Sequence, residues 1–399
     1  MPDTKSDVNT HGWNWGLVVR AYVMDGPGRI RLSTVDDPVC GPDEILLATE
    51  AVSVCSTDIS YFKGHLFPTS WPIIPGHEYV GEVVEVGSSL TGRVGVGQRI
   101  TYWGQTDFGG MAELRAIRPI FAHDVAARET SWYTTRNFYD ADQAAAVAVP
   151  DTMDSTAATI VEPLTSVLRS LLINPPRPGD SCVVLGCGPS AQLAIQVLTK
   201  VLGAGSVTAV DRVDPRLALS RHNGARLTFN TTTDGPALEQ FVHDHQDEFA
   251  DYVFDALPNV AVGDQGKDVR ELAMGLLRPG GLYVIYGATE VPQHISTWLI
   301  LAKGLHLRAT PFDVRLFPMQ RSAHVAQVAM TLIDTGVIDV GPVVSDHIDF
   351  GDEDAVRRAF AGYGTAGSMK FSLLTPVART RIEATNTREG ELVHAGSGR

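Results

Sequence analysis

A buried strand that runs straight into a glycine-rich turn and a helix is the feature that most constrains the fold of this chain. The strand SCVVLGCG begins at Ser181, and the helical pattern PSAQLAIQVLTKVLG follows from Pro189. Further strands are expected at 206–211, 250–257 and 282–288, and helices at 215–224 and 269–281. Short alternation of strands and helices predicts a parallel sheet with helices on both faces.

The turn has the residues of a dinucleotide-binding loop. Gly186 permits the tight turn, Gly188 lets the backbone approach a pyrophosphate, and the small Ala191 allows close packing of helix on strand. The helix starts at Pro189 and Ser190, so its N-terminus faces the phosphates. The alternative is an ordinary strand-to-helix turn.

Asp211 ends the next strand, 25 residues after Gly186. Its carboxylate is placed to accept hydrogen bonds from both ribose hydroxyls and to repel a 2′-phosphate, which predicts NAD rather than NADP. Arg212 could contact a phosphate and weaken that preference. The alternative is an ordinary cap or turn acid.

The N-terminal part consists of short alternating runs that glycine and proline interrupt. Strands are expected within 17–24, 29–38, 44–55, 79–87, 92–103 and 109–117, which predicts a small β-barrel. After Thr310, a helix at 324–339 and strands at 343–350 and 369–374 follow. Residues 119–143, polar and aromatic without a period, are expected to form an ordered lid or packing segment rather than an exposed loop.

The patterns predict an α/β plus β protein of two domains, as the length of 399 residues also favours. The expected parts are an N-terminal arm (1–16), a barrel domain (17–164 and 312–375), a nucleotide-binding domain (165–311) and a flexible C-terminal tail (376–399).

Charge and cysteine content limit the partners and the compartment. A net charge of −14 disfavours nucleic acid and anionic membranes, which would repel the chain. Four cysteines without paired spacing, and no apolar segment after Met1, predict a reduced cytoplasmic protein. No run reaches the roughly 18 apolar residues of a membrane span.

Three residues of the predicted barrel suggest a metal site. Cys55, His77 and Glu78 supply a thiol, an imidazole and a carboxylate, the mixture that Zn²⁺ accepts while leaving a position open for substrate. Each alone has a simpler interpretation, since a cysteine in an apolar run is usually a small core residue and a His-Glu pair usually lies at the surface.

The chain resembles the zinc-dependent medium-chain alcohol and polyol dehydrogenases from about Leu17 to Leu374. The shared motifs are CxTD, from Cys55 through Thr57 to Asp58, then GHE-x-x-G-x5-G from Gly76, and finally the nucleotide turn, in the family's order and spacing. The resemblance implies a GroES-like irregular β-barrel catalytic domain with an inserted Rossmann domain.

The resemblance also implies the ligands of one catalytic zinc ion. Glu162, in VEPLTSVL, matches the family's third ligand position, so the set is Cys55 and His77 with Glu78 and Glu162 as carboxylates that exchange with water. Taken alone, Glu162 would be a helix N-terminal acid. The four closely spaced cysteines of the family's structural zinc site are absent near 103–109, which predicts no second zinc ion.

Residues after Cys55 match further positions of the family. Thr57 would take the proton of the alcohol, and Asp58 would be a supporting acid. Ser60 stands where many relatives carry a histidine that passes the proton to solvent, and serine cannot hold a proton at neutral pH. Tyr61 matches a substrate-side tyrosine of the polyol enzymes, while Lys63 and His65 are more easily understood as solvated.

The implied reaction transfers hydride between a secondary alcohol of a polyol, sugar or (amino)cyclitol and NAD, giving the ketone. The stretch from Cys55 is especially similar to aminocyclitol (2-deoxy-scyllo-inosamine-type) dehydrogenases of antibiotic biosynthesis. The alternatives are a threonine-type amino-alcohol dehydrogenase, a zinc-free reductase, and a non-catalytic NAD-binding protein of the same fold. The strand near HLRAT resembles the one through which relatives pair, so a homodimer or homotetramer is expected.

Overall fold

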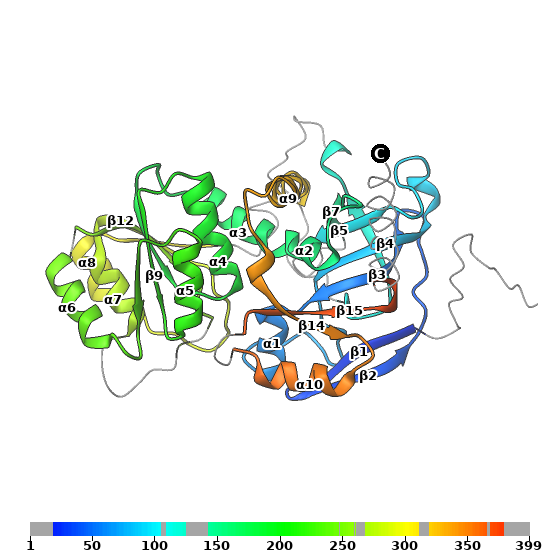
Figure 1. Cartoon of the computed structure of the whole chain (residues 1–399), viewed down its shortest axis with the longest axis horizontal. Helices are drawn as coiled ribbons and strands as arrows, with labels where there is room; N and C mark the ends of the chain where they lie inside the picture. Colours follow the sequence, from blue (N-terminus) through cyan, green and yellow to red (C-terminus); the bar gives the residue numbers. More distant parts are fainter. Residues whose placement is uncertain are drawn as a thin grey trace, which may run out of the picture.

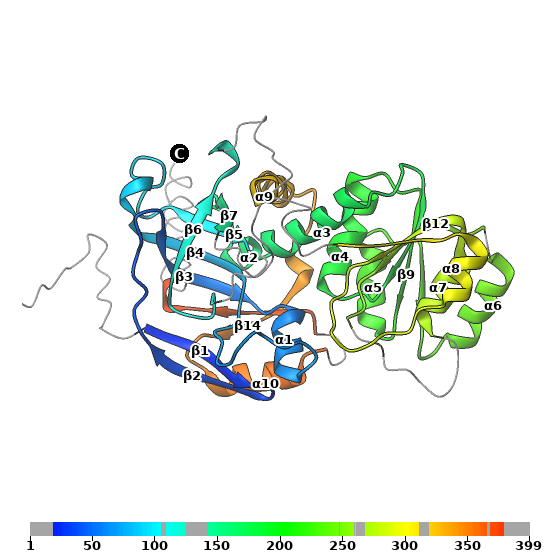
Figure 2. The same ribbon diagram turned by 180° about the vertical axis from the view of Figure 1, so that it is seen from behind.

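The computed structural model describes residues 19–104, 109–124, 143–246, 248–258, 260, 268–310, 319–364 and 368–378. It has two domains, each built on its own sheet, and they lie side by side in Figures 1 and 2. The predicted α/β plus β class is therefore confirmed. The arm at 1–16, residues 125–142 of the expected lid segment, and the tail from 379 onward lie outside the described residues.

The six-stranded sheet is parallel throughout, in the order β10-β9-β8-β11-β12-β13. Its strands are β8 (Ser181–Leu185), β9 (Ser206–Asp211), β10 (Leu227–Asn230), β11 (Ala250–Asp255), β12 (Leu277–Ile285) and β13 (His306–Ala309). Along β8, Cys182 and Val184 pack into one buried cluster, whereas Val183 and Leu185 pack into another. Because helices cover both faces of the sheet, this strand is apolar and buried from Cys182 to Leu185.

Helices connect these strands and form the two outer layers. They are α4 (Pro189–Gln196), α5 (Asp214–His222), α6 (Gly235–His245), α7 (Val269–Leu276) and α8 (Thr297–Lys303), and α4 continues into a π-helical turn at Val197–Val201. The helix predicted at 269–281 is wrong beyond Leu276, because residues 277–281 begin β12. Pro279 cannot donate a helical hydrogen bond, and Gly280 has a φ of 73°.

The seven-stranded sheet, in the order β14-β15-β3-β4-β5-β7-β6, closes into a barrel because β3 also pairs with β6. Strand β3 pairs with β4 along one edge and with β6 and β15 along the other. The strands are β3 (Ile45–Ser53), β4 (Glu78–Val86), β5 (Arg99–Trp103), β6 (Leu114–Ile120), β7 (Gln143–Ala148), β14 (Val344–Asp349) and β15 (Lys370–Leu374). A hairpin of β1 (Val19–Gly26) and β2 (Arg29–Val35) lies beside the barrel.

The barrel domain also contains α1 (Ser56–Lys63), α2 (Ser155–Thr159), α3 (Val161–Ile173), α9 (Met319–Asp334) and α10 (Glu353–Gly362). The predicted boundary at 164/165 falls inside α3, which runs from the barrel to the nucleotide-binding domain. At the end of this helix, the side chain of Asn174 donates a hydrogen bond to the carbonyl of Ala309 in the nucleotide-binding domain. Ser155–Ile173 is the one stretch of the described chain long and apolar enough to span a membrane, and 78% of the apolar window is buried, as in a core helix.

A buried ion pair fixes the segment that leads into α2 and α3. Arg99 on β5 lies 2.7 Å from Glu50 on β3, and both side chains are fully buried. The same guanidinium donates to the carbonyls of Pro150 and Met153, and Ser155 donates to Glu50. Every charge in this cluster has a hydrogen-bond partner, which is the condition for tolerating buried charge.

The predicted tail begins too early. Val377 and Ala378 are buried, and Val377 packs with Val19, Leu46 and Leu114 of the barrel domain.

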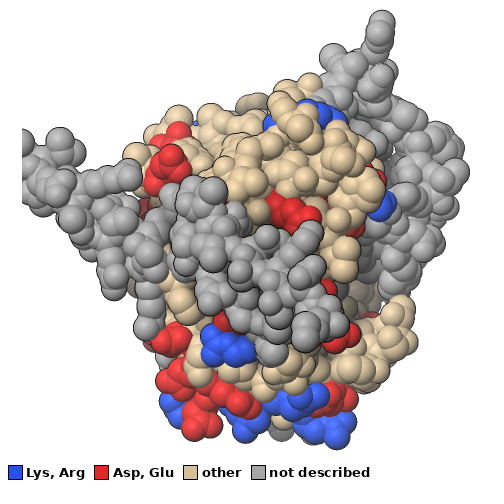
Figure 3. All heavy atoms as spheres, turned by 90° about the vertical axis from the view of Figure 1, so that its right-hand side faces the viewer, with Lys and Arg blue, Asp and Glu red and all other residues tan. Residues whose placement is uncertain are grey.

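On the surface of this end of the molecule, acidic and basic side chains are interspersed along the lower part of the face in Figure 3.

Candidate active site

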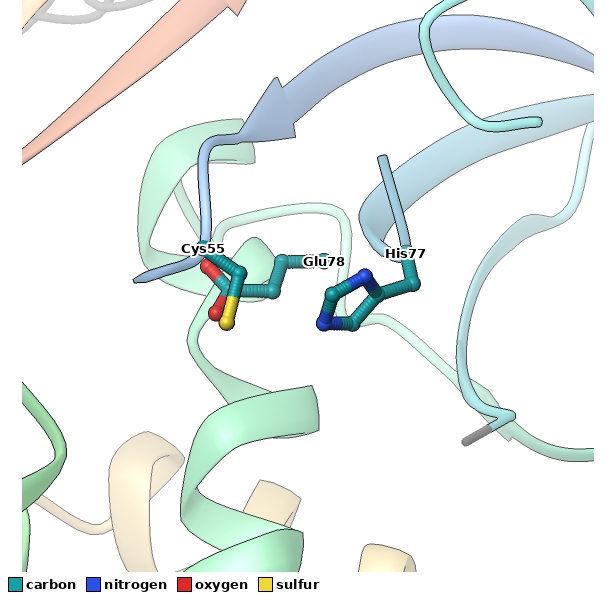
Figure 4. A group of neighbouring side chains, drawn as sticks. All are labelled: Cys55, His77 and Glu78. Atoms are coloured by element: carbon teal, nitrogen blue, oxygen red, sulfur yellow. The ribbon is translucent and has the colours of Figure 1, made fainter. Parts of the chain in front are cut away.

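Cys55, His77 and Glu78 converge at one end of the barrel. One ligand atom from each of them lies within 4.8 Å of the others, and Figure 4 shows the sulfur, the imidazole and the carboxylate directed toward a common point. Cys55 directly precedes α1 at the end of β3, whereas His77 and Glu78 lie where β4 begins. The antiparallel register pairs Ser53 with Glu78, so the fold brings the two segments together.

Asp58 ties these two segments to each other. Its carboxylate accepts hydrogen bonds from the backbone N–H of Cys55 (2.9 Å) and of Gly76 (3.0 Å), and it lies 3.9 Å from Nδ1 of His77. Gly76 has a φ of 92°, and a Cβ there would lie 2.8 Å from the side chain of Met111, so only glycine fits. This geometry agrees with the supporting role expected of Asp58.

Lys370, which the sequence did not single out, lies beside the three ligands. Its Nζ is 2.5 Å from Oε1 of Glu78, and both side chains are buried. The pairing of Ser372 with Ser53 places Lys370 next to Cys55, because the strands β15 and β3 are antiparallel. A lone lysine in the apolar run MKFSLL was the available signal.

The three side chains suit a zinc ion in chemistry as well as in position. Oε2 of Glu78 is buried without a hydrogen-bond partner, which a bound cation would satisfy. Burial, reinforced by the Glu78 carboxylate, raises the pKa of Cys55 to about 12. The thiol therefore becomes a good ligand only when a cation displaces its proton.

Glu162 lies next to this group but is not part of it. It is the second residue of α3 and is buried, and Ser166 on the same helix donates to its Oε1 at 3.3 Å. Burial raises the pKa of Glu162 to about 8. His77 lowers this pKa, whereas the nearby Glu78 and Cys55 raise it further. The carboxylate of Glu162 thus interacts electrostatically with the three candidate ligands. Its direct coordination of a zinc ion stays a prediction.

The expected proton-relay residues all lie on α1. Oγ1 of Thr57 is 3.6 Å from the sulfur of Cys55. Ser60 is buried one turn further along, and Tyr61 packs its ring edge-on against Trp71 with centroids 6.5 Å apart. Lys63 points away, to the carbonyl of Tyr363. The helix therefore carries Thr57 at the metal end, and the roles of Thr57, Ser60 and Tyr61 stay predictions.

The glycine-rich turn lies where the sequence predicts it, between β8 and α4. Gly186 has a φ of 75°, and a Cβ there would lie 2.8 Å from the side chain of Leu257. Nothing lies within 4 Å of a Cβ built on Gly188, so its backbone is open to a ligand. Ser190 shares a hydrogen bond with Tyr286.

Asp211 braces this turn from the neighbouring strand. Its carboxylate accepts from the backbone N–H of Cys187 (2.6 Å) and of Val213 (2.9 Å), as a turn acid would. Arg212 is exposed. Arg216, which no sequence pattern singles out, donates from Nη2 to the carbonyl of Ser368 in the barrel domain at 3.0 Å.

Comparison with known proteins agrees with this arrangement. Two family models match, the alcohol dehydrogenase GroES-like domain over residues 41–124 and the zinc-binding dehydrogenase over residues 191–316. Sorbitol dehydrogenase from Bacillus subtilis is 23% identical over 350 residues, which cover 86% of this chain and 93% of the relative. The chain belongs to the zinc-dependent medium-chain alcohol and polyol dehydrogenase family.

As a member of this family, the dehydrogenase is an oxidoreductase that acts on CH–OH groups. An alcohol dehydrogenase from Escherichia coli CFT073, solved with NADH, superposes with a TM-score of 0.70 at 18% identity, over 90% of this chain and 100% of that one. A zinc-binding dehydrogenase from Sinorhizobium meliloti 1021, solved with NADP, gives 0.67 at 22% identity, over 90% and 99%. These two structures show that the fold is shared.

Proposed function

We propose that the dehydrogenase transfers hydride between NAD and a secondary alcohol of a polyol, sugar or (amino)cyclitol, giving the ketone. The observation that carries the proposal is the convergence of Cys55, His77 and Glu78 within 4.8 Å at the barrel end. A glycine-rich turn open to a ligand on the neighbouring domain supplies the second half of the site.

The roles of the chain's own residues follow from their positions. Cys55, His77 and Glu78, with Glu162 beside them, would hold one zinc ion, whose chemistry is that of a Lewis acid for the alcohol oxygen. Thr57, whose oxygen lies next to Cys55, would accept the hydroxyl proton while passing its own proton onward. Ser60 can extend this hydrogen-bonded path but not store the proton, so water must take it up.

The nucleotide would bind across the N-terminus of α4. Backbone N–H groups there face outward from the helix and favour the negative charge of a pyrophosphate. Asp211 supports NAD rather than NADP, because a carboxylate at this strand end repels a 2′-phosphate. Holding the alcohol carbon against the nicotinamide would then be the main contribution of the two domains to the rate.

The substrate class rests on the resemblance of the Cys55 stretch to polyol and aminocyclitol enzymes, with Tyr61 on the substrate side. A threonine-type amino alcohol is the second candidate.

We also infer a homodimer. On α8, next to the edge strand β13, Trp298 and Leu301 are 70% and 78% exposed, and a second copy could cover them. Light scattering on wild type and Leu301→Asp would test this, with a monomeric variant expected.

The purified enzyme offers a direct test of the function. Metal analysis should give one zinc ion per chain, and NADH should form with at least one polyol, cyclitol or aminocyclitol in a panel that includes L-threonine. Cys55→Ala should lose both zinc and turnover yet still bind NADH. Turnover by Cys55→Ala would exclude the proposal, and activity restricted to L-threonine would favour the second candidate.

A further inference from the structure

Ser166 links the carboxylate of Glu162 to a buried tryptophan. Nε1 of Trp103 donates to Oγ of Ser166 at 2.8 Å, and this hydroxyl donates to Oε1 of Glu162 at 3.3 Å. Trp103 is the last residue of β5, whereas Ser166 and Glu162 are one turn apart on α3. The contact therefore connects the barrel wall to the helix that carries the carboxylate.

The direction of the hydrogen bond from Trp103 is fixed by the chemistry of the partners, and that of the bond from Ser166 holds for ionised Glu162, the form that would bind a metal ion. An indole N–H can only donate, so Ser166 must accept from Trp103 with an oxygen lone pair. The single proton of the hydroxyl is then left for Glu162. A serine without such a donor partner could rotate its proton toward the helix carbonyls, so the tryptophan orients the serine.

Trp103 itself has no freedom to move. It is fully buried, and the guanidinium of Arg169 lies 4.0 Å from the centre of its ring. Arg169 is one turn beyond Ser166 on the same helix, so α3 holds the indole by two side chains. The donor to Ser166 is therefore held in one orientation.

We propose that Ser166 is a positioning residue for zinc binding, which holds one oxygen of Glu162 so that the other is kept toward Cys55, His77 and Glu78. The inference rests on the proposed function, because it assumes that a zinc ion occupies this group. Ser166 would then act from outside the set of metal ligands, with Trp103 as its hydrogen-bond donor. Hydrogen-bond partners behind metal ligands typically contribute about 10- to 100-fold in metal affinity or activity.

The test compares Ser166→Ala with Thr165→Val. Thr165 is the preceding residue on α3 and donates its single hydroxyl proton to the carbonyl of Val161 at 2.6 Å, so this proton is not available to Glu162. Competition with a chromophoric chelator should show that Ser166→Ala binds zinc about tenfold more weakly than wild type. Thr165→Val should match wild type, and Ser166→Thr should restore affinity because it keeps a hydroxyl.

A second variant separates the orientation of the serine from its presence. Trp103→Phe keeps an aromatic ring but lacks the N–H, so it should weaken zinc binding in the same direction and by less than Ser166→Ala. A zinc affinity of folded Ser166→Ala within about twofold of wild type would overturn the inference. Failure of wild type itself to bind zinc would instead overturn the proposed function.

Discussion

The ammonium of Lys370 lies 2.5 Å from Oε1 of Glu78, and both side chains are removed from solvent. The cation thus neutralises a carboxylate that would otherwise be an isolated buried charge. Because Lys370 leaves Oε2 of Glu78 without a partner, the pair is compatible with a second cation on the other side.

Replacing Lys370 with methionine should destabilise the metal-free protein by about 3–5 kcal/mol, because the Glu78 charge loses its buried partner. Zinc should recover part of this loss by supplying positive charge to the same carboxylate. Urea denaturation with a chelator and with added zinc would measure both effects. Arg31→Met, which breaks a half-exposed pair with Asp25, is the control and should cost less than about 1 kcal/mol.

Stability of the metal-free protein should depend on pH through Glu162. Its pKa is raised from 4.5 to about 8, so across this range the folded protein holds a proton that the unfolded chain has released. The free energy of unfolding should therefore fall as the pH rises from about 4.5 to 8, by at most about 1.4 kcal/mol per pH unit, and level off above. Glu162→Gln should remove this contribution, whereas Glu239→Gln, on an exposed part of α6, should keep it. Parallel slopes for wild type and Glu162→Gln would contradict the prediction.

Asp211 should affect both cofactor choice and stability. Wild type is expected to use NAD better than NADP, and Asp211→Ala should reduce that preference. The same change should lower the melting temperature, because the N–H groups of Cys187 and Val213 lose their acceptor, at a cost of about 1–3 kcal/mol each if they stay dry. Asp211→Asn keeps an acceptor oxygen without the charge, so it separates the two effects. Better use of NADP by wild type would refute the assignment.

The buried pair of Arg99 and Glu50 should be among the most sensitive positions for folding. Arg99→Met removes the partner of Glu50 and the donors to two carbonyls, and should cost about 3–5 kcal/mol in the free energy of unfolding. Arg278→Met, at a partly exposed pair with Asp251, should cost less than about 1 kcal/mol. Equal losses in the two variants would show that burial is not the reason.

Sequence was sufficient where the signal is local. The apolar run of β8 indicates a strand that is buried on both faces, and Gly186 indicates a turn with a positive φ. Both signals come from residues adjacent in the sequence. The metal group could also be predicted, because Cys55 and His77 belong to motifs with a fixed spacing.

Contacts that depend on strand pairing could not be predicted. Lys370 is 292 residues from Glu78, and only the register of β15 on β3 brings it beside Cys55. The contact of Trp103 with Ser166 likewise requires the packing of α3 on the barrel. The helix predicted over 277–281 does not form, because Pro279 and Gly280 disfavour a helix there and the chain enters β12 instead.

The barrel strands also set which parts of the enzyme can be redesigned. Glu78 and Lys370 begin the strands β4 and β15, Cys55 follows the strand β3 that lies between them, and β3 is hydrogen-bonded along both edges. A slip of β3 by one residue would have to break two ladders at once. Loops 36–44 and 87–98 lie at the opposite end, where Leu90 and Val94 belong to the core but Gly92 is exposed, so a tag or linker inserted at Gly92 should leave the chemistry undisturbed.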